Sequence, residues 1–125
     1  MLTITQVGRV MVPVADQDEA IEFYTKKLGF SLAADVPFGD GERWVEVTPP
    51  SGGTNLSLVP AQGAFQTGQM TGIALMSKDP RADHAEMKAG GVDVDADFMG
   101  GGGGVPLMFF FRDNSKNHLM VVQQY

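Results

Sequence analysis

The sequence predicts an α+β fold made of two βαβββ modules, and three observations support this prediction. Strand-like and helix-like patterns follow one another in the order βαβββ and then repeat that order. A weak internal repeat relates the two halves. A polar, glycine-bearing segment without periodicity, residues 61–69, lies between them. We therefore divide the single domain, residues 1–125, into a first module (1–60), a linker (61–69) and a second module (70–125).

In the first module, residues 7–14 alternate in hydropathy, which predicts a strand with valines on one face. Asp16 matches a helix N-cap, with Glu19 three residues later as in a capping box. Apolar residues then recur at helical spacing until Gly29, which we expect to end the helix. Apolar runs bounded by turn signals predict three further strands at 30–38, 43–49 and 54–60.

In the second module we expect a strand at 71–77 and then a helix capped by Asp79. His84 is expected on the solvated face of this helix, which ends at the Gly90–Gly91 pair. The pattern predicts three more strands at 92–99, 105–113 and 118–124. Five consecutive glycines, 100–104, are expected to form either a flexible rim or plain loop slack.

The repeat appears when the sequence is shifted by 62 residues. It aligns Ala20 with Ala82, Lys26 with Lys88, Gly29 with Gly91 and Asp35 with Asp97. These identities are few, but they keep both helix ends and both following strands in register. The repeat therefore supports two modules of the same architecture.

Composition excludes several classes of function. A chain of 125 residues that is 43% hydrophobic suits one globular domain. A net charge of −6 without any basic run argues against nucleic acid or an anionic membrane as partner. The absence of cysteine excludes disulfides and thiolate chemistry. We see no signal peptide and no membrane span, and we expect a cytoplasmic protein without a membrane partner.

If each helix covers one face of its strands, the opposite faces must meet something else, and two modules side by side would form a shared trough. Its lining would mix apolar and polar groups, as small-molecule pockets do. The candidate ligand-binding residues are Arg9, Met11, Trp44, Glu46, Asn55, Ser57, Met76, Phe110, His118 and Met120.

Several roles within this set stay open. Trp44 and Glu46 belong to the trough only if strand 43–49 presents them to it, and the other orientation presents Val45 and Val47. Arg9 either pairs with an internal carboxylate, Glu46 or Asp113, or binds an anionic ligand. The methionines could equally fill core. Arg112 and Asp113 are expected to pair near a turn, and no Ser-His-Asp triad is supported.

The chain resembles the vicinal oxygen chelate superfamily of glyoxalases, bleomycin-resistance proteins and extradiol dioxygenases. The resemblance lies in VADQDEAIEFYTKKLGF at 14–30, RWVEVTPP at 43–50, LSLVP at 56–60 and FFFRDNSKNHLMVV at 109–122. It implies paired βαβββ modules that form a cup-shaped mixed sheet with helices outside, and often a homodimer. It specifies a scaffold and leaves the chemistry open.

Enzymes of this superfamily hold a divalent metal with His, Glu or Gln side chains from four strands. The resemblance places these four positions on Arg9, Ser57, Gly72 (or Thr71) and Met120. Arginine has no lone pair to offer, glycine has no side chain, and a thioether is a poor ligand for hard divalent metals. We therefore expect no metal and no other cofactor; a relocated site using His118 and Glu46 is the remaining possibility.

We expect a metal-independent binding protein of the bleomycin-resistance type, which takes a small aromatic or anionic molecule. The alternative is a lyase, isomerase or dioxygenase of the same superfamily, using a relocated metal or Glu46 as a base. A third hypothesis is a dimerising module that has lost its ligand.

Overall fold

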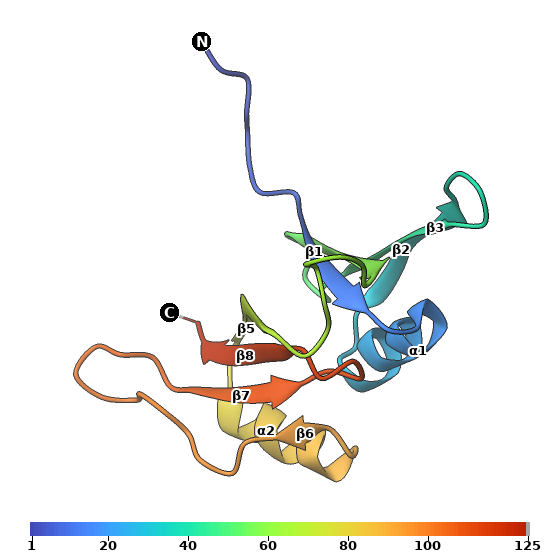
Figure 1. Ribbon diagram of the computed structural model, residues 1–125. Coiled ribbons are helices and arrows are strands. Elements are labelled where there is room, and N and C mark those ends of the chain that lie inside the picture. The colour runs from blue at the N-terminus through green and yellow to red at the C-terminus, as the bar shows by residue number, and fades with distance from the viewer. Residues whose placement is uncertain (125) are drawn as a thin grey trace. The chain divides into compact units, whose positions relative to one another are not determined.

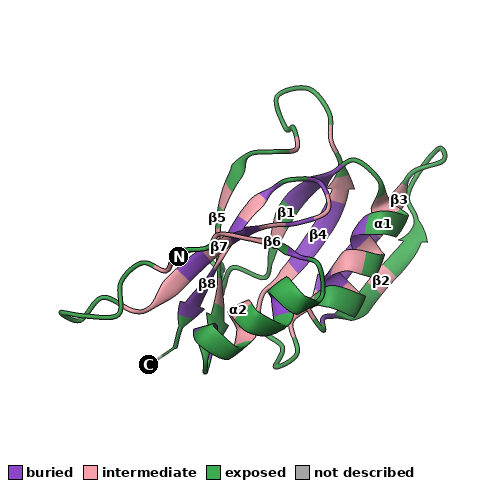
Figure 2. Cartoon of the chain, turned by 90° about the horizontal axis from the view of Figure 1, so that it is seen from below, coloured by how far each residue is buried: buried purple, intermediate pink, exposed green. Residues whose placement is uncertain are grey.

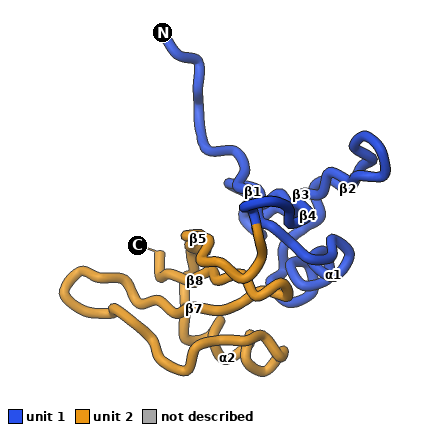
Figure 3. The backbone as a smooth tube through the Cα atoms, in the orientation of Figure 1, with its two compact units in different colours: residues 1–65 blue, residues 66–125 orange. Residues whose placement is uncertain are grey.

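The computed structural model describes residues 1–124, and the chain divides into two compact units, residues 1–65 and residues 66–125 (Figure 3). Each unit contains a four-stranded mixed sheet and one helical segment (Figure 1). The predicted α+β architecture is confirmed.

Unit 1 is a βαβββ module whose sheet has the strand order β1-β4-β3-β2. Strands β1 and β4 are parallel, and the other neighbours are antiparallel. Its elements are β1 (Arg9–Val14), α1 (Gln17–Glu22), the π-helix η1 (Phe23–Lys27), β2 (Ser31–Pro37), β3 (Arg43–Thr48) and β4 (Asn55–Pro60).

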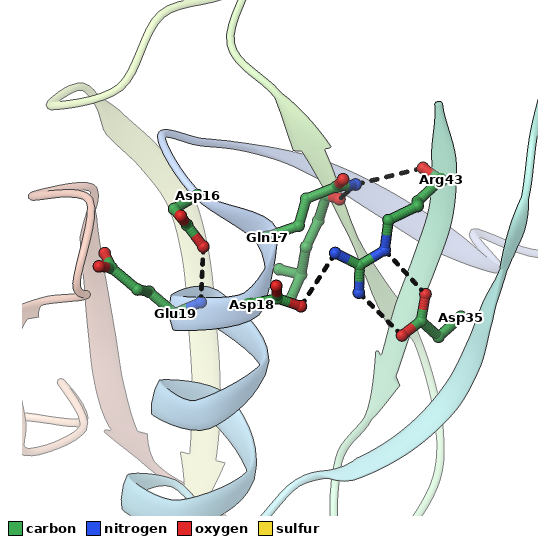
Figure 4. Close-up of polar contacts among 7 residues, drawn as sticks. Asp16, Gln17, Asp18, Glu19, Asp35 and Arg43 are labelled. Carbon is green, nitrogen blue, oxygen red and sulfur yellow. Dashed lines mark hydrogen bonds and ion pairs between the residues drawn. The ribbon is translucent and has the colours of Figure 1, made fainter. Parts of the chain in front are cut away.

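The first helix begins and ends where the sequence predicts. The Asp16 side chain accepts a hydrogen bond from the backbone N–H of Glu19 at 2.9 Å, which is the predicted N-cap (Figure 4). The helix continues from α1 into η1 and stops before Gly29, whose φ of +76° favours glycine. The π-helical turn is a feature that the hydropathy pattern does not reveal.

Arg43 connects α1 to the edge of the unit 1 sheet. Its guanidinium contacts Asp35 on β2 at 2.9 Å and Asp18 on α1 at 2.9 Å (Figure 4). Gln17 of the same helix donates to the backbone carbonyls of Arg43 and Leu58. These contacts fix how α1 lies on its sheet, although ion pairs this exposed add little stability.

Unit 2 repeats the same topology, with the strand order β5-β8-β7-β6 and a parallel β5–β8 pair. Its elements are β5 (Met70–Ser77), α2 (Pro80–Ala89), β6 (Asp93–Val94), β7 (Met108–Arg112) and β8 (His118–Gln123). Helix α2 has the predicted Asp79 cap, and Gly91 follows it with a φ of +86°. Both helices therefore end at the glycines that the repeat aligns.

The sequence overestimates two strands of unit 2. The strand predicted at 92–99 is reduced to β6, followed by a bond from the Asp95 N–H to the Phe110 carbonyl and an isolated bridge between Met99 and Met108. The strand predicted at 105–113 forms only at 108–112. Between them the glycine run folds into a turn closed by a bridge between Gly102 and Val105. Because β6 is an edge strand and pairs on one side with β7, alternating hydropathy alone does not fix its length.

The sequence predicts His84 on a solvated face of α2, and this prediction is wrong. It is half-buried, and its ring packs 4.7 Å from Phe98 and 4.9 Å from Phe109, centroid to centroid. Its Nε2 lies 2.7 Å from the carbonyl oxygen of Asp95, to which it donates. The imidazole therefore helps to attach α2 to its sheet.

The expected Arg112–Asp113 pair is also wrong. Arg112 pairs with Asp93 at 2.8 Å and with Asp95 at 2.5 Å, across the β6–β7 ladder. Asp113 is buried and instead accepts hydrogen bonds from the backbone N–H groups of Ser115 and Asn117. Successive residues of an extended chain point to opposite faces, so the side chains of Arg112 and Asp113 do not readily pair with each other.

Burial is concentrated in the strands, whereas the helices expose most of their surface (Figure 2). In unit 1, Val12, Val45, Val47 and Leu58 are essentially inaccessible. In unit 2 the same holds for Phe109, Phe111 and Leu119. Each unit thus places its main apolar layer between its sheet and its helix. The opposite face of each sheet carries a different set of side chains, which includes the candidate site residues.

Candidate functional site

The strand register settles which face of β3 carries Trp44 and Glu46. Glu46 lies opposite Ser57, and Val47 lies opposite Leu56. Val45 and Val47 are buried in the apolar layer, so Trp44 and Glu46 belong to the other face. That face also carries Arg9 and Met11 of β1, because they pair with Asn55 and Ser57 of β4. All six candidate residues of unit 1 are therefore brought together on the sheet face opposite α1.

Glu46 is the centre of a polar network on this face. One carboxylate oxygen, Oε2, accepts from Arg9 Nε at 3.0 Å and from Trp44 Nε1 at 2.5 Å. The other, Oε1, accepts from Asn55 Nδ2 at 3.0 Å. Asn55 is held in turn by Thr48, whose hydroxyl donates to Asn55 Oδ1 at 2.9 Å. Only 4% of Glu46 is exposed, so these three donors replace the water that the carboxylate loses on folding.

This network keeps Glu46 ionised. Burial alone would raise the pKa of the carboxyl group and is the largest single influence on it. The hydrogen bonds from Asn55 and Trp44, together with the charge and hydrogen bond of Arg9, outweigh burial. The pKa of Glu46 is therefore lowered from its ordinary value of 4.5. A carboxylate stabilised in this way is a weak base, which disfavours Glu46 as a general base.

Arg9 connects this network to solvent. Its side chain is 53% exposed, and among residues 1–124 its hydrogen-bonding partner is Glu46, reached through Nε. Its guanidinium carbon lies 6.0 Å from the centroid of the Trp44 ring, in the range of a cation–π contact. The internal-carboxylate interpretation of Arg9 is thus correct for Nε, while the terminal nitrogens have no protein partner within the described chain.

Trp44 also forms an aromatic pair with an exposed phenylalanine. Its ring centroid lies 5.8 Å from that of Phe38, with an interplanar angle of 49°. Phe38 lies at the start of the β2–β3 turn and is 60% exposed. Phe38 is not among the site residues that the sequence predicts. A large apolar residue beside the turn signal GDGE was the available clue, since such positions are usually polar.

The four candidates of unit 2 also share one sheet face. Met120 of β8 pairs with Phe110 of β7, while Met76 of β5 and His118 lie on the same side at neighbouring register positions. Phe109 and Phe111 point the other way and are 0% exposed. The alternation predicted for the three consecutive phenylalanines is therefore present, and Phe110 lies opposite to its two neighbours.

A bulge interrupts β5 at the third of the four family ligand positions. The register shifts between Met70 and Ala74, and Gly72 has a φ of +75°. The Thr71 hydroxyl donates to the His118 carbonyl at 2.7 Å and accepts from the Ile73 N–H at 3.1 Å. The only oxygen-bearing side chain at this position is thus occupied in holding the bulge.

These donors do not fit a divalent metal. Arg9 is a cation bound to Glu46, Ser57 offers a neutral hydroxyl, Gly72 offers no side chain and Met120 offers a thioether. Within residues 1–124, no group of three or more His, Asp or Glu side chains is placed to hold a metal ion. Both oxygens of Glu46 are already engaged by protein donors, so the relocated site considered above gains no support.

Unit 2 carries an open surface pocket of about 430 Å³ that is separate from the candidate residues. It lies beside the beginning of α2 and the glycine turn. Its lining consists of Lys78, Asp79, Pro80, Arg81, Gly100, Gly101, Leu107 and Gln123. None of the ten candidates lines this pocket, so we do not assign the site to it.

Comparison with known proteins identifies the class. The family model of the glyoxalase/bleomycin resistance protein/dioxygenase superfamily matches residues 6–121. The chain therefore belongs to this superfamily, as the sequence motifs indicated. The uncharacterized protein YetH of Bacillus subtilis (strain 168) is 37% identical over 91 residues, which cover 72% of this chain and 76% of YetH.

Two solved structures show the same fold over nearly the whole chain. TnmS3, an antibiotic binding protein from Streptomyces sp. CB03234, is 31% identical, with a TM-score of 0.86 and full coverage of both chains. A superfamily member from Sphaerobacter thermophilus is 25% identical, with a TM-score of 0.89, covering 98% of this chain and 100% of that chain. In the described part of the chain, no helix has the length and apolar character needed to cross a membrane.

Proposed function

We propose that this protein binds a small aromatic or anionic molecule on the unit 1 sheet face opposite α1, without a catalytic metal. The carrying observation is the arrangement of Arg9: its Nε donates to Glu46, its side chain is half-exposed, and its guanidinium carbon lies 6.0 Å from the Trp44 ring centroid. A guanidinium that is oriented by an ion pair through Nε and lies beside an indole ring suits a planar ligand that bears negative charge.

The similarity to TnmS3 supports a binding role over an enzymatic one, because that protein is described as antibiotic binding. The chemistry of the side chains on this face also favours binding. Glu46 is already held by three donors, and the four family positions carry no metal-ligating side chain. No group on this face is therefore equipped for the family's metal chemistry. A superfamily lyase, isomerase or dioxygenase remains the competing function. The proposal also includes a cytoplasmic location and a homodimer, and sedimentation measurements on the purified protein can test the homodimer.

The first test is ligand-induced stabilisation. We expect at least one compound from a panel of aromatic carboxylates, phenols and bleomycin to raise the unfolding temperature in a concentration-dependent manner. A ligand at 100 times its Kd adds about 2.7 kcal/mol to the free energy of unfolding. Arg9→Met should weaken binding of an anionic compound by about 1.5–3 kcal/mol, because a charged hydrogen bond is lost.

Arg81→Met is the matched control, because Arg81 is an exposed arginine of unit 2 whose guanidinium carbon lies 4.8 Å from the Phe98 ring centroid. It should leave the affinity unchanged. Unchanged affinity in Arg9→Met, accompanied by lower stability, would assign Arg9 to structure alone. A panel that stabilises nothing would favour the dimerising-module hypothesis.

The second test separates binding from metal chemistry. We expect protein purified without chelators to contain no stoichiometric metal. Titration with nickel, zinc, manganese or iron(II) should shift the unfolding temperature by less than about 1 °C, because the donor set offers no site of useful affinity. Elemental analysis measures the metal content, and thermal unfolding measures the shift in unfolding temperature. One bound metal per chain, or a saturable shift of several degrees, would establish the enzymatic alternative as the better hypothesis.

A further inference from the structure

The hydroxyl of Ser57 has no hydrogen-bonding partner among the described residues. Ser57 is 0% exposed, and its Oγ is buried without a hydrogen bond from any of residues 1–124. Buried hydroxyl groups in native proteins are nearly always paired, because losing water without compensation costs free energy. An unpaired hydroxyl at the centre of a candidate site therefore requires an explanation.

The neighbours of Ser57 do not provide that partner. Glu46 lies directly opposite on β3, but its carboxylate is turned toward Arg9, Trp44 and Asn55. On the other side, Met11 of β1 offers only a thioether, which is a weak acceptor. The strand pairing thus places the hydroxyl between one acceptor that is already occupied and one that is poor.

The terminal nitrogens of Arg9 lie within reach of the same small region. Arg9 pairs with Asn55, two residues from Ser57 along β4, so Arg9 and Ser57 are diagonal neighbours on one face. Parallel strands lie about 4.8 Å apart and rise about 3.3 Å per residue, so such diagonal neighbours are separated by about 8 Å, a gap that a small bridging group can span. Both side chains present donors, so the complementary group is an acceptor with negative charge.

An apolar surface flanks these donors. Trp44 and the exposed Phe38 form the aromatic pair on the neighbouring strand and its turn. Glu46 repels an anion at short range but is neutralised by Arg9, which it also orients. A carboxylate is preferred to a single oxygen, because its two oxygens can accept from the arginine fork and still leave lone pairs for a hydroxyl.

We propose that the Ser57 hydroxyl and the terminal nitrogens of Arg9 together bind the carboxylate of an aryl carboxylate, whose ring packs against Trp44 and Phe38. This inference rests on the proposed binding function and assigns its ligand class. Serine occupies one of the four family ligand positions; here its hydroxyl recognises an organic anion.

The test compares 2-naphthoate with its neutral isostere 2-naphthamide by isothermal titration calorimetry. The wild type should prefer the acid. Ser57→Ala should weaken 2-naphthoate binding about tenfold or more and 2-naphthamide binding by no more than about threefold, since hydrogen bonds to charged acceptors are the stronger ones. Arg9→Lys should also weaken acid binding, because it keeps the charge and loses the fork.

Stability provides a second readout. Ser57→Ala removes an unsatisfied hydroxyl, so the unfolding temperature of the free protein should stay the same or rise. Ser77→Ala is the matched control: Ser77 is also a buried serine, but its hydroxyl donates to Asp83 and accepts from the Asp79 N–H. This control should lower the unfolding temperature and leave 2-naphthoate affinity unchanged.

The possible failures are distinguishable. If the wild type binds neither probe nor any other compound of the panel, the proposed function itself is wrong. If it binds both probes equally, or if Ser57→Ala binds 2-naphthoate as the wild type does, the binding function stands and the carboxylate assignment is wrong. A fall in unfolding temperature for Ser57→Ala as large as that for Ser77→Ala would show a structural role for the hydroxyl and would also overturn the assignment.

Discussion

Replacing Phe109 by alanine should lower the free energy of unfolding by about 3–5 kcal/mol, the usual range for truncating a buried phenylalanine. Phe109 is 0% exposed, and its ring centroid lies 4.9 Å from that of His84 and 5.5 Å from that of Phe98. The substitution removes the aromatic contact that joins β7 to α2 and leaves a cavity between them. Urea denaturation followed by far-UV circular dichroism measures the loss.

Phe110→Ala is the matched control, since it changes the next residue of the same strand on the opposite face. Phe110 is half-buried, so its truncation should cost no more than about 2 kcal/mol. If the unit 2 face contributes to ligand contact, Phe110→Ala should also weaken binding of an aromatic ligand, while Phe109→Ala should change affinity little under conditions in which it is folded. Equal stability losses for the two variants would contradict the assigned faces of β7.

The second large effect is expected at Glu46. Glu46→Ala should lower the free energy of unfolding by about 3 kcal/mol, because it leaves the Trp44 and Asn55 donors without their acceptor and Arg9 without its counter-charge. The value lies at the lower end for a broken ion pair, since Arg9 is half-exposed. Glu46→Gln should cost less, because the amide oxygen can still accept from one of these donors.

The effect should depend on pH with a defined sign. The pKa of Glu46 is lowered in the folded protein, so the folded state binds fewer protons at this group than the unfolded state does. Its contribution to stability is complete above the unfolded pKa, about 4.5, and is lost as the pH falls through the lower folded value. The stability difference between wild type and Glu46→Gln should therefore narrow below pH 4.5. A difference that widens on acidification would contradict the network.

The sequence alone determined the features that depend on local spacing. The period of two in a strand separated Phe110 from its two neighbours, and the glycines at 29 and 91 marked the ends of both helices through their positive φ. The two-module organisation also followed from the chain, because the order of strands and helices is a linear property. Strand lengths at the sheet edge were less predictable, since a single pairing partner sets them.

Only the tertiary structure decided which groups meet. The orientation of β3 was open in the sequence, because both Trp44–Glu46 and Val45–Val47 are reasonable inward faces; burial of the two valines fixed it. The partner of Arg9 lies 37 residues away in the chain, and the unpaired hydroxyl of Ser57 depends on where the Glu46 oxygens turn. Hydrogen bonds between strands depend on register and side-chain direction, which hydropathy patterns do not encode.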